Sequence, residues 1–570
     1  MKEIAALVPK TSQTIVVSID LGTSGTGFAY AHVKDTQGKV YNNVDWDGQL
    51  FKYCKTLSAI LYEGNTRVAI GHNARETIND QEEDSSNNNY HFIEHFKMNF
   101  MKDPNSTIHV NGKGFSVKKV MKDYLEEIKT VALEFIKKSE TSLRKEMIRW
   151  VFTVPAQYDD RLKHELKLIA KEAGIIEKIN SEEQCMIVTE PEAAAVYCIE
   201  EMKKDREIKK GDSIIIMDAG GGTVDFTTHI INDQMLLREV TQQTGGSHGS
   251  TNLDRKFEEL LVNKLGQDLI DDLKSNMSSF YNVKVAWESY KPKIRSLNKT
   301  YSILVPQLAS FIMSGNYHNI KPGFFRTQNA TISMTPADLE FVYNETLEQI
   351  CGLLDQQISK ASAELGTERI TYLFIVGGFG QCQILTDKIA REFGDQFESI
   401  RTPSFAGEAI MNGAALLGIN PSLIKIRKAR LTYGVETSPE FDTKIHKREN
   451  YIRKDGRHLC SKVFHPFVRA GEEVEIGYEA AQEFYALGET AEICVYSSVC
   501  DFMDEDVVYV DDLMVSELAV ISIKVPQDAR TIRVTMIFGK SEFLVKVEND
   551  DQEQEEYTLK FDAKSLDMRQ

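Results

Sequence analysis

Two glycine-rich segments of this chain combine an aspartate with several glycines, a set of residues suited to holding phosphate groups. The first, residues 19–27, reads IDLGTSGTG, and the second, residues 217–225, reads MDAGGGTVD. Successive glycines let backbone N–H groups converge on an anion without obstruction from Cβ atoms. Asp20 and Asp218 could hold a hydrated Mg²⁺ beside the phosphates. Tight β-hairpins shaped only by turn geometry are the alternative, but the repeated design favours a duplicated phosphate-binding site.

Each glycine-rich segment lies between two expected strands. Residues 14–19 and 213–217 are apolar and β-branched, and the chain resumes as strands over 27–33 and 224–231. In the Walker and Rossmann loops a helix follows the glycines, and its N-terminus holds the phosphate. The pattern here instead predicts two β-hairpins whose tips face the phosphates.

The composition is that of an ordinary globular protein with several domains. At 570 residues the chain is too long for one core, and a prior of about 150 residues per domain predicts three or four units. The net charge of −18 argues against nucleic acid or anionic membranes as partners. No stretch approaches the roughly 18 apolar residues of a membrane span. Eight cysteines without a CxxC pair indicate reduced thiols, so we expect a cytoplasmic or nuclear protein.

The chain divides into an α/β part and a β-rich tail. Strands alternate with amphipathic helices up to about residue 419, which predicts layered α/β domains. Helices are expected at 118–138, 159–173, 252–273, 283–297 and 335–365, and further buried strands at 150–154 and 372–376. From about residue 431 onward, short alternating segments predict the antiparallel strands of a sandwich. The basic run at 425–430 is interpreted as an exposed junction.

Further segments could complete a nucleotide site. They are FTVPAQY at 152–158, TEPEAAA at 189–195, WESYK at 287–291 and VGGFG at 376–380. In the last of these, glycines follow a strand and precede a helix, so the backbone could pass close under a flat ligand such as adenosine. Glu288 and Lys291 are three residues apart on one helical face and could reach ribose hydroxyls. The alternative for this pair is an ordinary surface ion pair.

The order of these motifs resembles the ATPase domain of the seventy-kilodalton heat-shock chaperones (Hsp70), in the actin and hexokinase superfamily. Five motifs, from Asp20 to GAA at 413–415, follow the family's order across residues 15–418. In the tail, LTYGVET at 431–437 and TIRVTMIF at 531–538 are similar to the first and a late strand of the family's substrate-binding β-domain. The resemblance implies a two-lobed actin-like ATPase fold with a duplicated ribonuclease-H-like motif, and ATP or ADP with Mg²⁺ as ligands.

The resemblance also implies a division into domains. We expect an N-terminal extension at 1–13, ATPase lobe I at 14–209, lobe II at 210–419 with a return to lobe I near 386–419, a linker at 420–430, and a small β-sandwich domain at 431–565 without a helical lid. The acidic, leucine-rich linker of the family is replaced here by NPSLIKIR at 420–427. This combination is similar to the divergent branch named heat shock protein family A member twelve.

Individual roles follow from the resemblance, position by position. Asp20 and Asp218 organise Mg²⁺ through water, Lys97 is the catalytic lysine, Glu190 lies near the attacking water, and Asp225 belongs to the same cluster. Contacts to the β- and γ-phosphates are assigned to Gly22, Thr23, Ser24, Gly220, Gly221, Gly222 and Thr223. The other nucleotide contacts are assigned to Gly246, Glu288, Lys291, Gly377, Gly378 and Phe379. Phosphoryl transfer needs in-line positioning and charge neutralisation more than covalent groups, and this set would supply both.

Several positions depart from the family pattern on the adenosine side. Pro292 stands where the family has an arginine that stacks on adenine. Phe379 and Gln381 replace a serine and an arginine, and Gly407 replaces an aspartate. These departures predict altered recognition of the base with an intact phosphate side.

Three functions are consistent with the sequence. The favoured one is an atypical chaperone-like ATPase, in which the nucleotide state alters a β-domain that contacts client or signalling proteins, with co-chaperones as further partners. The second is a nucleotide-gated scaffold with negligible hydrolysis, suggested by the altered adenosine side and the missing lid. The third is a small-molecule kinase of the same superfamily, which the β-rich tail and the motif order make the least favoured.

Overall fold

The computed structural model describes residues 13–557 apart from 36–37, 50, 81–88, 180, 182, 206, 276, 316, 318–319, 404, 455, 487–489, 503–506, 526–530, 539–543 and 550–553. Apart from Gln13, the expected N-terminal extension lies outside the described residues, as does the chain after 557. Within the described residues, no helix combines the length and apolar character that crossing a bilayer requires.

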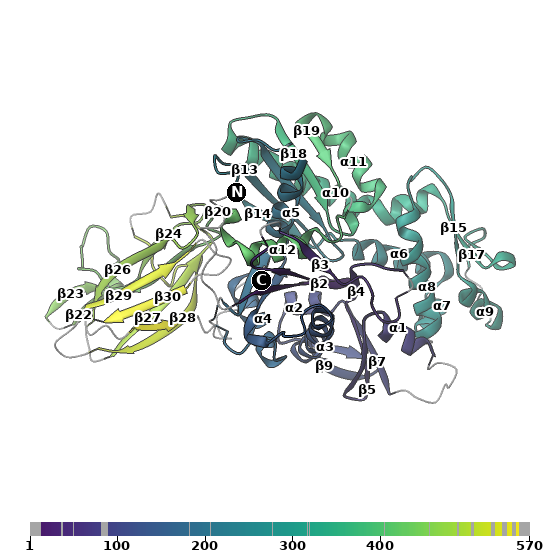
Figure 1. Cartoon of the computed structure of the whole chain (residues 1–570), viewed down its shortest axis with the longest axis horizontal. Coiled ribbons are helices and arrows are strands. Elements are labelled where there is room, and N and C mark those ends of the chain that lie inside the picture. The colour runs from purple at the N-terminus through teal and green to yellow at the C-terminus, as the bar shows by residue number, and fades with distance from the viewer. Residues whose placement is uncertain are drawn as a thin grey trace.

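A six-stranded sheet forms the centre of the first lobe (Figure 1). Its order is β11 (Cys185–Thr189), β10 (Ile148–Val154), β1 (Ile15–Leu21), β2 (Gly25–His32) and β3 (Val40–Asn42), with β4 (Lys55–Leu57) also paired to β2. On one face, side chains of β1 share a core with α3 (Val117–Lys137) and α4 (Asp160–Glu172). The periodicity of the sequence predicted both helices to within about two residues at each end.

A seven-stranded sheet forms the centre of the second lobe. Its order is β19 (Phe397–Arg401), β18 (Ile370–Val376), β12 (Ser213–Ala219), β13 (Val224–Ile231), β14 (Leu237–Gly246), β20 (Ile424–Lys428) and β25 (Glu473–Glu475). One hydrophobic core contains residues of this sheet together with residues of five helices: α6 (Thr251–Leu265), α7 (Gln267–Ser275), α8 (Met277–Tyr290), α10 (Pro336–Leu365) and α11 (Gln383–Phe393).

The two sheets repeat one arrangement around each glycine-rich turn. β1 pairs antiparallel with β2 and parallel with β10, while β12 pairs antiparallel with β13 and parallel with β18. Between the sheets, α5 (Glu190–Asp205) and α12 (Ala409–Ile419) share a core with Val16 of β1 and Ile214 of β12. Because α11 and β19 pack with the second sheet, the chain reaches the first sheet at α12, later than the expected residue 386.

Smaller elements extend each lobe. The first lobe adds β5 (Ala59–Glu63), β6 (Thr66–Ile70), α1 (Gly71–Asp80), β7 (Tyr90–Glu94), α2 (Phe96–Lys102), β8 (Thr107–Val110) and β9 (Lys113–Ser116). The second adds β15 (Tyr301–Leu304), α9 (Pro306–Ser314), β16 (Phe325–Arg326) and β17 (Thr331–Met334).

Two expected helices differ from the structure, and one residue explains each difference. The helix expected at 252–273 is two helices, α6 and α7, separated at Gly266, whose φ of 93° no helix can accommodate. The helix expected at 283–297 is α8, which ends at Tyr290 and is followed by a 3₁₀ turn over Lys291–Lys293. Pro292 lacks the N–H that a continued α-helix would need.

Two four-stranded antiparallel sheets make up most of the tail, which extends to one side of the two lobes (Figure 1). The first contains β24 (Val463–Val468), β21 (Thr432–Thr437), β27 (Thr490–Ser498) and β28 (Val515–Lys524). The second contains β26 (Glu479–Tyr485), β29 (Thr531–Ile537), β30 (Leu544–Asn549) and β31 (Gln554–Tyr557). Both contribute to one hydrophobic core, and β22 (Tyr451–Lys454) with β23 (Arg457–Cys460) forms a separate hairpin.

The segment expected as an exposed junction is a strand of the second lobe. β20 pairs parallel with β14, and β25, a short strand from the tail, pairs antiparallel with β20. Arg427 is buried and its Nε lies 2.6 Å from Glu192 Oε1 at the start of α5. The interpretation of 425–430 as exposed was therefore wrong, because Arg427 faces the buried Glu192 carboxylate and the other basic residues of this strand and its end are only partly exposed.

Candidate functional site

The two glycine-rich turns lie against each other at the centre of the molecule. A methyl group added at Gly221 would overlap Ser24 Oγ, and one added at Gly222 would overlap Thr23 Oγ1. The second turn is held from behind by the start of α6, because Gly249, Ser250 and Thr251 donate backbone hydrogen bonds of 2.8 to 3.1 Å to carbonyls of residues 220–222. Glycine is thus required here by the closeness of the two turns as well as by the turn geometry.

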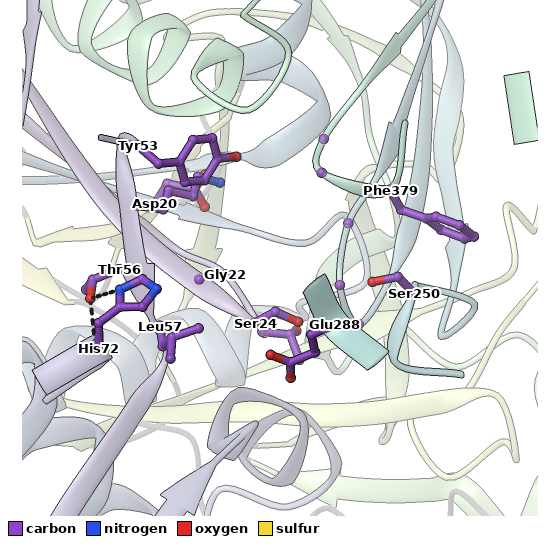
Figure 2. A pocket seen from close by; sticks show the side chains of 18 of the residues that line it. Asp20, Gly22, Ser24, Tyr53, Thr56, Leu57, His72, Ser250, Glu288 and Phe379 are labelled. Atoms are coloured by element: carbon purple, nitrogen blue, oxygen red, sulfur yellow. Dashed lines mark hydrogen bonds and ion pairs between the residues drawn. The ribbon is translucent and has the colours of Figure 1, made fainter. Parts of the chain in front are cut away.

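A cavity of about 680 Å³ opens at this contact, a volume within the range of about 300–1,000 Å³ typical of small-molecule sites. Figure 2 shows Asp20, Gly22 and Ser24 on one side and Ser250 and Phe379 on the other. Of the residues assigned from the sequence, the lining includes Asp20, Gly22, Thr23, Ser24, Lys97, Glu190, Asp218, Gly220, Gly221, Gly222, Thr223, Glu288, Gly377, Gly378 and Phe379. We call the part around the two turns the phosphate end and the part around Glu288 and Phe379 the base end.

Asp20 is engaged by two side chains of its own lobe. Lys55 Nζ lies 2.6 Å from Asp20 Oδ2, and Thr153 Oγ1 donates to Asp20 Oδ1 at 3.2 Å. Burial alone would lower the pKa of Lys55, but the adjacent Asp20 carboxylate raises this pKa above its ordinary value. The lysine is therefore a fixed positive charge at the phosphate end.

Lys97 and Glu190 form a second buried ion pair. Lys97 lies on α2, Glu190 is the first residue of α5, and Lys97 Nζ lies 2.6 Å from Glu190 Oε1. Burial raises the pKa of Glu190, the Lys97 ammonium lowers it, and the Asp20 carboxylate raises it again; the net shift is upward. The pair brings a cation and a carboxylate from two separate elements to the same wall of the cavity.

Asp218 lines the cavity, and one of its carboxylate oxygens is buried without a partner in the described part of the chain. It is 2% exposed, and its Oδ1 has no hydrogen-bond partner among the residues that the structure describes. Burial, followed by the charges of Glu190 and Asp225, raises the pKa of Asp218 well above its ordinary value. An ionised carboxylate that is buried without a partner is costly, so this oxygen is suited to a cation or to a water bound to one.

Gly377 and Asp225 support Asp218 from two sides. Gly377, with a φ of 83°, follows β18, and a methyl group built there would lie 2.6 Å from Asp218 Oδ1. Asp225 is opposite Asp218 in the strand pairing of β12 with β13. Its side chain is fully buried, and it is not among the residues that line the cavity. Burial, together with the Glu190 charge, raises the pKa of Asp225 to about 7.

The base end is formed by residues from both lobes. Phe379 is buried in the core of the second lobe and lines the cavity together with Val285 and Ser289 of α8. Glu288 Oε2 accepts a hydrogen bond of 3.0 Å from Arg75 Nη2, which belongs to α1 of the first lobe. Arg75 Nε also donates to the hydroxyl of Tyr281. The Arg75–Glu288 ion pair thus connects the two lobes at the base end of the cavity.

Two assigned nucleotide contacts lie elsewhere. Lys291 Nζ lies 2.6 Å from Asp254 Oδ1, which also accepts a hydrogen bond from Trp287 Nε1, and Lys291 is absent from the lining. Gly246 ends β14 beside His248 and does not line the cavity. The i, i+3 spacing with Glu288 did not bring Lys291 to the cavity because Asp254 of α6 pairs with its ammonium.

Sequence reasoning did not single out several lining residues of the first lobe. They are Gln49, Phe51, Tyr53, Lys55, Thr56, Leu57, His72 and Arg75. Six of these eight come from β4 and the short irregular stretch before it, which have no glycine motif or periodicity to mark them. The replacement of the family's aspartate by Gly407 was an indirect sign of Tyr53. A methyl group at Gly407 would overlap the Tyr53 hydroxyl, so only glycine leaves room for this side chain.

Comparison with known proteins identifies the family. A family model described as Hsp70 protein matches residues 65–476. This chain belongs to the Hsp70 family. Heat shock 70 kDa protein 12A of Homo sapiens is 25% identical, over 93% of this chain and 88% of that protein. The Mus musculus protein of the same name is 26% identical with the same coverage, and heat shock 70 kDa protein 12B of Homo sapiens is 25% identical over 94% and 89%.

The α/β part of this Hsp70-family chain is an actin-like ATPase domain, as the order of motifs predicted. The predicted likeness to the divergent twelve branch is also confirmed, because the similarity to proteins 12A and 12B spans nearly the whole chain. The family model itself covers the second glycine-rich turn and the start of the tail, and it begins after the first turn.

Proposed function

We propose that this Hsp70-family chain binds a nucleoside triphosphate with Mg²⁺ between the two glycine-rich turns and hydrolyses it. The observation that carries the proposal is the contact between the turns, which brings Asp20 and Asp218 from different lobes to one cavity. Thr23, Ser24 and residues 220–223 would supply backbone and hydroxyl donors to the phosphates from both sides.

The carboxylates of the phosphate end fit a divalent cation in part. Asp218 lines the cavity, and its Oδ1 is buried and unpartnered in the described part of the chain, which suits a ligand of a hydrated Mg²⁺. Asp20 would share the ion through water, but it already accepts from Lys55 and Thr153. When bound, Mg²⁺ would neutralise charge on the phosphates and polarise the bond to be broken.

The Lys97–Glu190 pair would provide the remaining groups for hydrolysis. Glu190 would orient a water for in-line attack and accept its proton, and Lys97 would stabilise the charge that develops on the γ-phosphate. The chaperone-like ATPase is the first of two candidates on this basis. The engagement of Asp20 by Lys55 and of Glu190 by Lys97 favours the second, a nucleotide-gated scaffold with slow turnover.

The junction supplies a route from the nucleotide to the tail, which we interpret as a β-sandwich domain that contacts proteins. Glu192 lies two residues after Glu190 on α5 and pairs with Arg427 of β20. Arg430 Nη1 donates to Ala156 O at 2.5 Å, and Tyr433 OH donates to Asp160 Oδ2 at 2.8 Å. A shift of α5 on binding or hydrolysis would therefore move the strand that carries the tail.

The proposal is tested by titrating Mg·ATP into the full chain and then following single-turnover conversion of the bound ATP to ADP. Wild type should bind ATP, and Asp218→Asn should weaken binding in Mg²⁺ by about fivefold, the equivalent of about 1 kcal/mol. Asn is nearly isosteric and removes a disfavoured buried charge, so this variant should fold. Asp355→Asn, at an exposed position of α10, is the matched control.

The outcomes separate the candidates. Conversion to ADP within minutes supports the ATPase, whereas binding without conversion supports the scaffold. Equal affinity of wild type and Asp218→Asn for Mg·ATP would remove the assigned site.

A further inference from the structure

Lys55 reaches the phosphate end past two glycines of β2, Gly25 and Gly27, which carry no side chain. Asp20 is opposite Gly27 in the pairing of β1 with β2, and Gly27 is opposite Lys55 in the pairing of β2 with β4. A methyl group built at Gly27 would lie 3.0 Å from Lys55 Cγ, and one at Gly25 would lie 3.5 Å from Lys55 Cβ. The absence of side chains at these two glycines thus gives the lysine stem its path to Asp20.

The ammonium at the end of that path stands beside one of the two carboxylates suited to Mg²⁺. Lys55 Nζ lies 2.6 Å from Asp20 Oδ2, while the Asp218 Oδ1 atom has no partner among the described residues. The two aspartates have matching places in their hairpins but differ in this respect. One retains an open oxygen, and the other is neutralised by a cation that belongs to the chain.

The Lys55 ammonium can donate hydrogen bonds to a bound ligand and to Asp20 at the same time. An ammonium has three N–H donors, Asp20 accepts one of them, and Lys55 lines the cavity together with Thr23 and Ser24. A phosphate oxygen held by the first turn would therefore lie within reach of a second donor of the same group. Strand pairing fixes the backbone of Lys55, which limits the entropy that the contact costs.

We propose that Lys55 is a built-in cation of the phosphate end: it neutralises Asp20, donates to a phosphate oxygen, and makes nucleotide binding less dependent on Mg²⁺. This inference rests on the nucleotide binding proposed above and adds a specificity-determining residue to it. Among the described residues, four carboxylates (Asp20, Glu190, Asp218 and Asp225) and two ammonium groups (Lys55 and Lys97) are clustered at this end. A triphosphate adds further negative charge, so without Lys55 the site would rely on the divalent cation.

The test compares the affinity for ATP in Mg²⁺ and in EDTA, by calorimetry on the full chain. In wild type, EDTA should weaken binding by less than about tenfold, or about 1.4 kcal/mol. In Lys55→Met, which keeps the stem and removes the charge, EDTA should weaken binding by about 100-fold or more. Lys55→Arg should retain the small effect of EDTA because it restores the charge.

Lys203→Met is the matched control, since it removes a lysine that is paired with Glu200 on α5, far along the helix from Glu190. It should behave as wild type in both conditions. Circular dichroism of each variant establishes folding, and if Lys55→Met does not fold, Lys55→Gln takes its place in the same comparison.

Each outcome decides a different statement. If wild type binds ATP only when Mg²⁺ is present, or if Lys55→Met shows the same ratio of affinities as wild type, the inference is wrong while the proposed function stands. If wild type binds ATP in neither condition, the proposed function itself fails. A ratio that widens at least tenfold in Lys55→Met and not in Lys55→Arg supports the role of Lys55.

Discussion

The phosphate end and the base end of the cavity are built in different ways. At the phosphate end, two turns of consecutive residues carry the glycines and the aspartates, and strand pairing on both sides fixes them. At the base end, Arg75, Glu288 and Phe379 come from three separated segments and two lobes. The phosphate end is therefore rigid and local in sequence, whereas the base end depends on how the lobes come together.

This difference has an electrostatic counterpart. Buried carboxylates and lysines crowd the phosphate end, and burial and neighbouring charges displace the pKa values of Glu190, Asp218 and Asp225. The base end has one partly exposed ion pair and one aromatic ring from the core. Substitutions at the two ends should therefore change different properties, and the following experiments test that contrast in order of decreasing effect.

The largest effect is expected on stability, from Asp225 at the phosphate end. Its pKa is raised to about 7 in the folded protein, above the ordinary value of 3.8. As the pH rises from the lower value to the higher one, the unfolded state loses a proton that the folded state keeps, so the free energy of unfolding falls. Above about pH 7 Asp225 is ionised in both states, and the free energy of unfolding no longer changes through this group. Asp225→Asn should remove the dependence, a difference of up to about 3 kcal/mol between pH 5 and 7.5.

Urea unfolding of wild type and Asp225→Asn at several pH values measures this effect. Asp355→Asn controls for the loss of one carboxylate at an exposed position. A gap between wild type and Asp225→Asn that stays constant from pH 5 to 7.5 would contradict the assignment.

The next effect concerns the contact between the turns. Gly222→Ala adds a methyl group that would overlap Thr23 Oγ1 of the facing turn and Met98 Sδ of α2, so the packing between the two turns must change. We expect affinity for ATP to fall by about 100-fold, or about 2.7 kcal/mol. Gly378→Ala is the matched variant at the base end, where nothing lies within 4 Å of the added atom, so it should fold as wild type does. Equal losses of ATP affinity in both variants would contradict the prediction that close packing of the turns matters only at the phosphate end.

A smaller effect is expected at Phe379. Phe379→Leu keeps an apolar side chain but removes the ring that lines the base end, so ATP should bind about tenfold more weakly, or about 1.4 kcal/mol. Inorganic triphosphate has no base, and its affinity should not change. Titrations with both ligands separate the two ends directly, and a parallel loss for both would show that the ring acts on the whole fold.

The smallest effect is expected at the ion pair that crosses the cavity. Arg75 and Glu288 are partly exposed, and such pairs contribute at most about 1 kcal/mol. Arg75→Met should therefore speed the release of a fluorescent ATP analogue by only about threefold to fivefold, measured by stopped flow. An unchanged rate would mean that the pair does not hold the lobes closed over the nucleotide.

Local patterns predicted the elements in which one segment fixes its own structure. The strand expected at 224–231 is β13, and the strands at 213–217 and 372–376 are β12 and β18 with a few more residues. Buried β-branched runs and helical periodicity depend on short-range geometry, so they can be recognised without a tertiary structure. Gly266 and Pro292 changed the helix boundaries for equally local reasons, which the periodicity alone did not weigh.

Residues whose position depends on distant partners could not be predicted. Lys55 was missed because its relation to Asp20 arises from two successive strand pairings. Lys291 was misplaced because Asp254, on another helix, holds it away from the cavity. Arg427 was expected in solvent because the buried carboxylate that faces it lies more than two hundred residues earlier in the chain.

The sequence by itself determined the two glycine-rich hairpins, the acidic residue in each, and the alternation of strands and helices that positions them, because these depend on neighbouring residues. Only the tertiary structure decided that the hairpin tips touch, that a lysine neutralises one aspartate and leaves the other open, and that β20 joins the second lobe to the tail. Those features depend on long-range strand pairing and on the burial of charge, which follow from the packing of segments far apart in the chain.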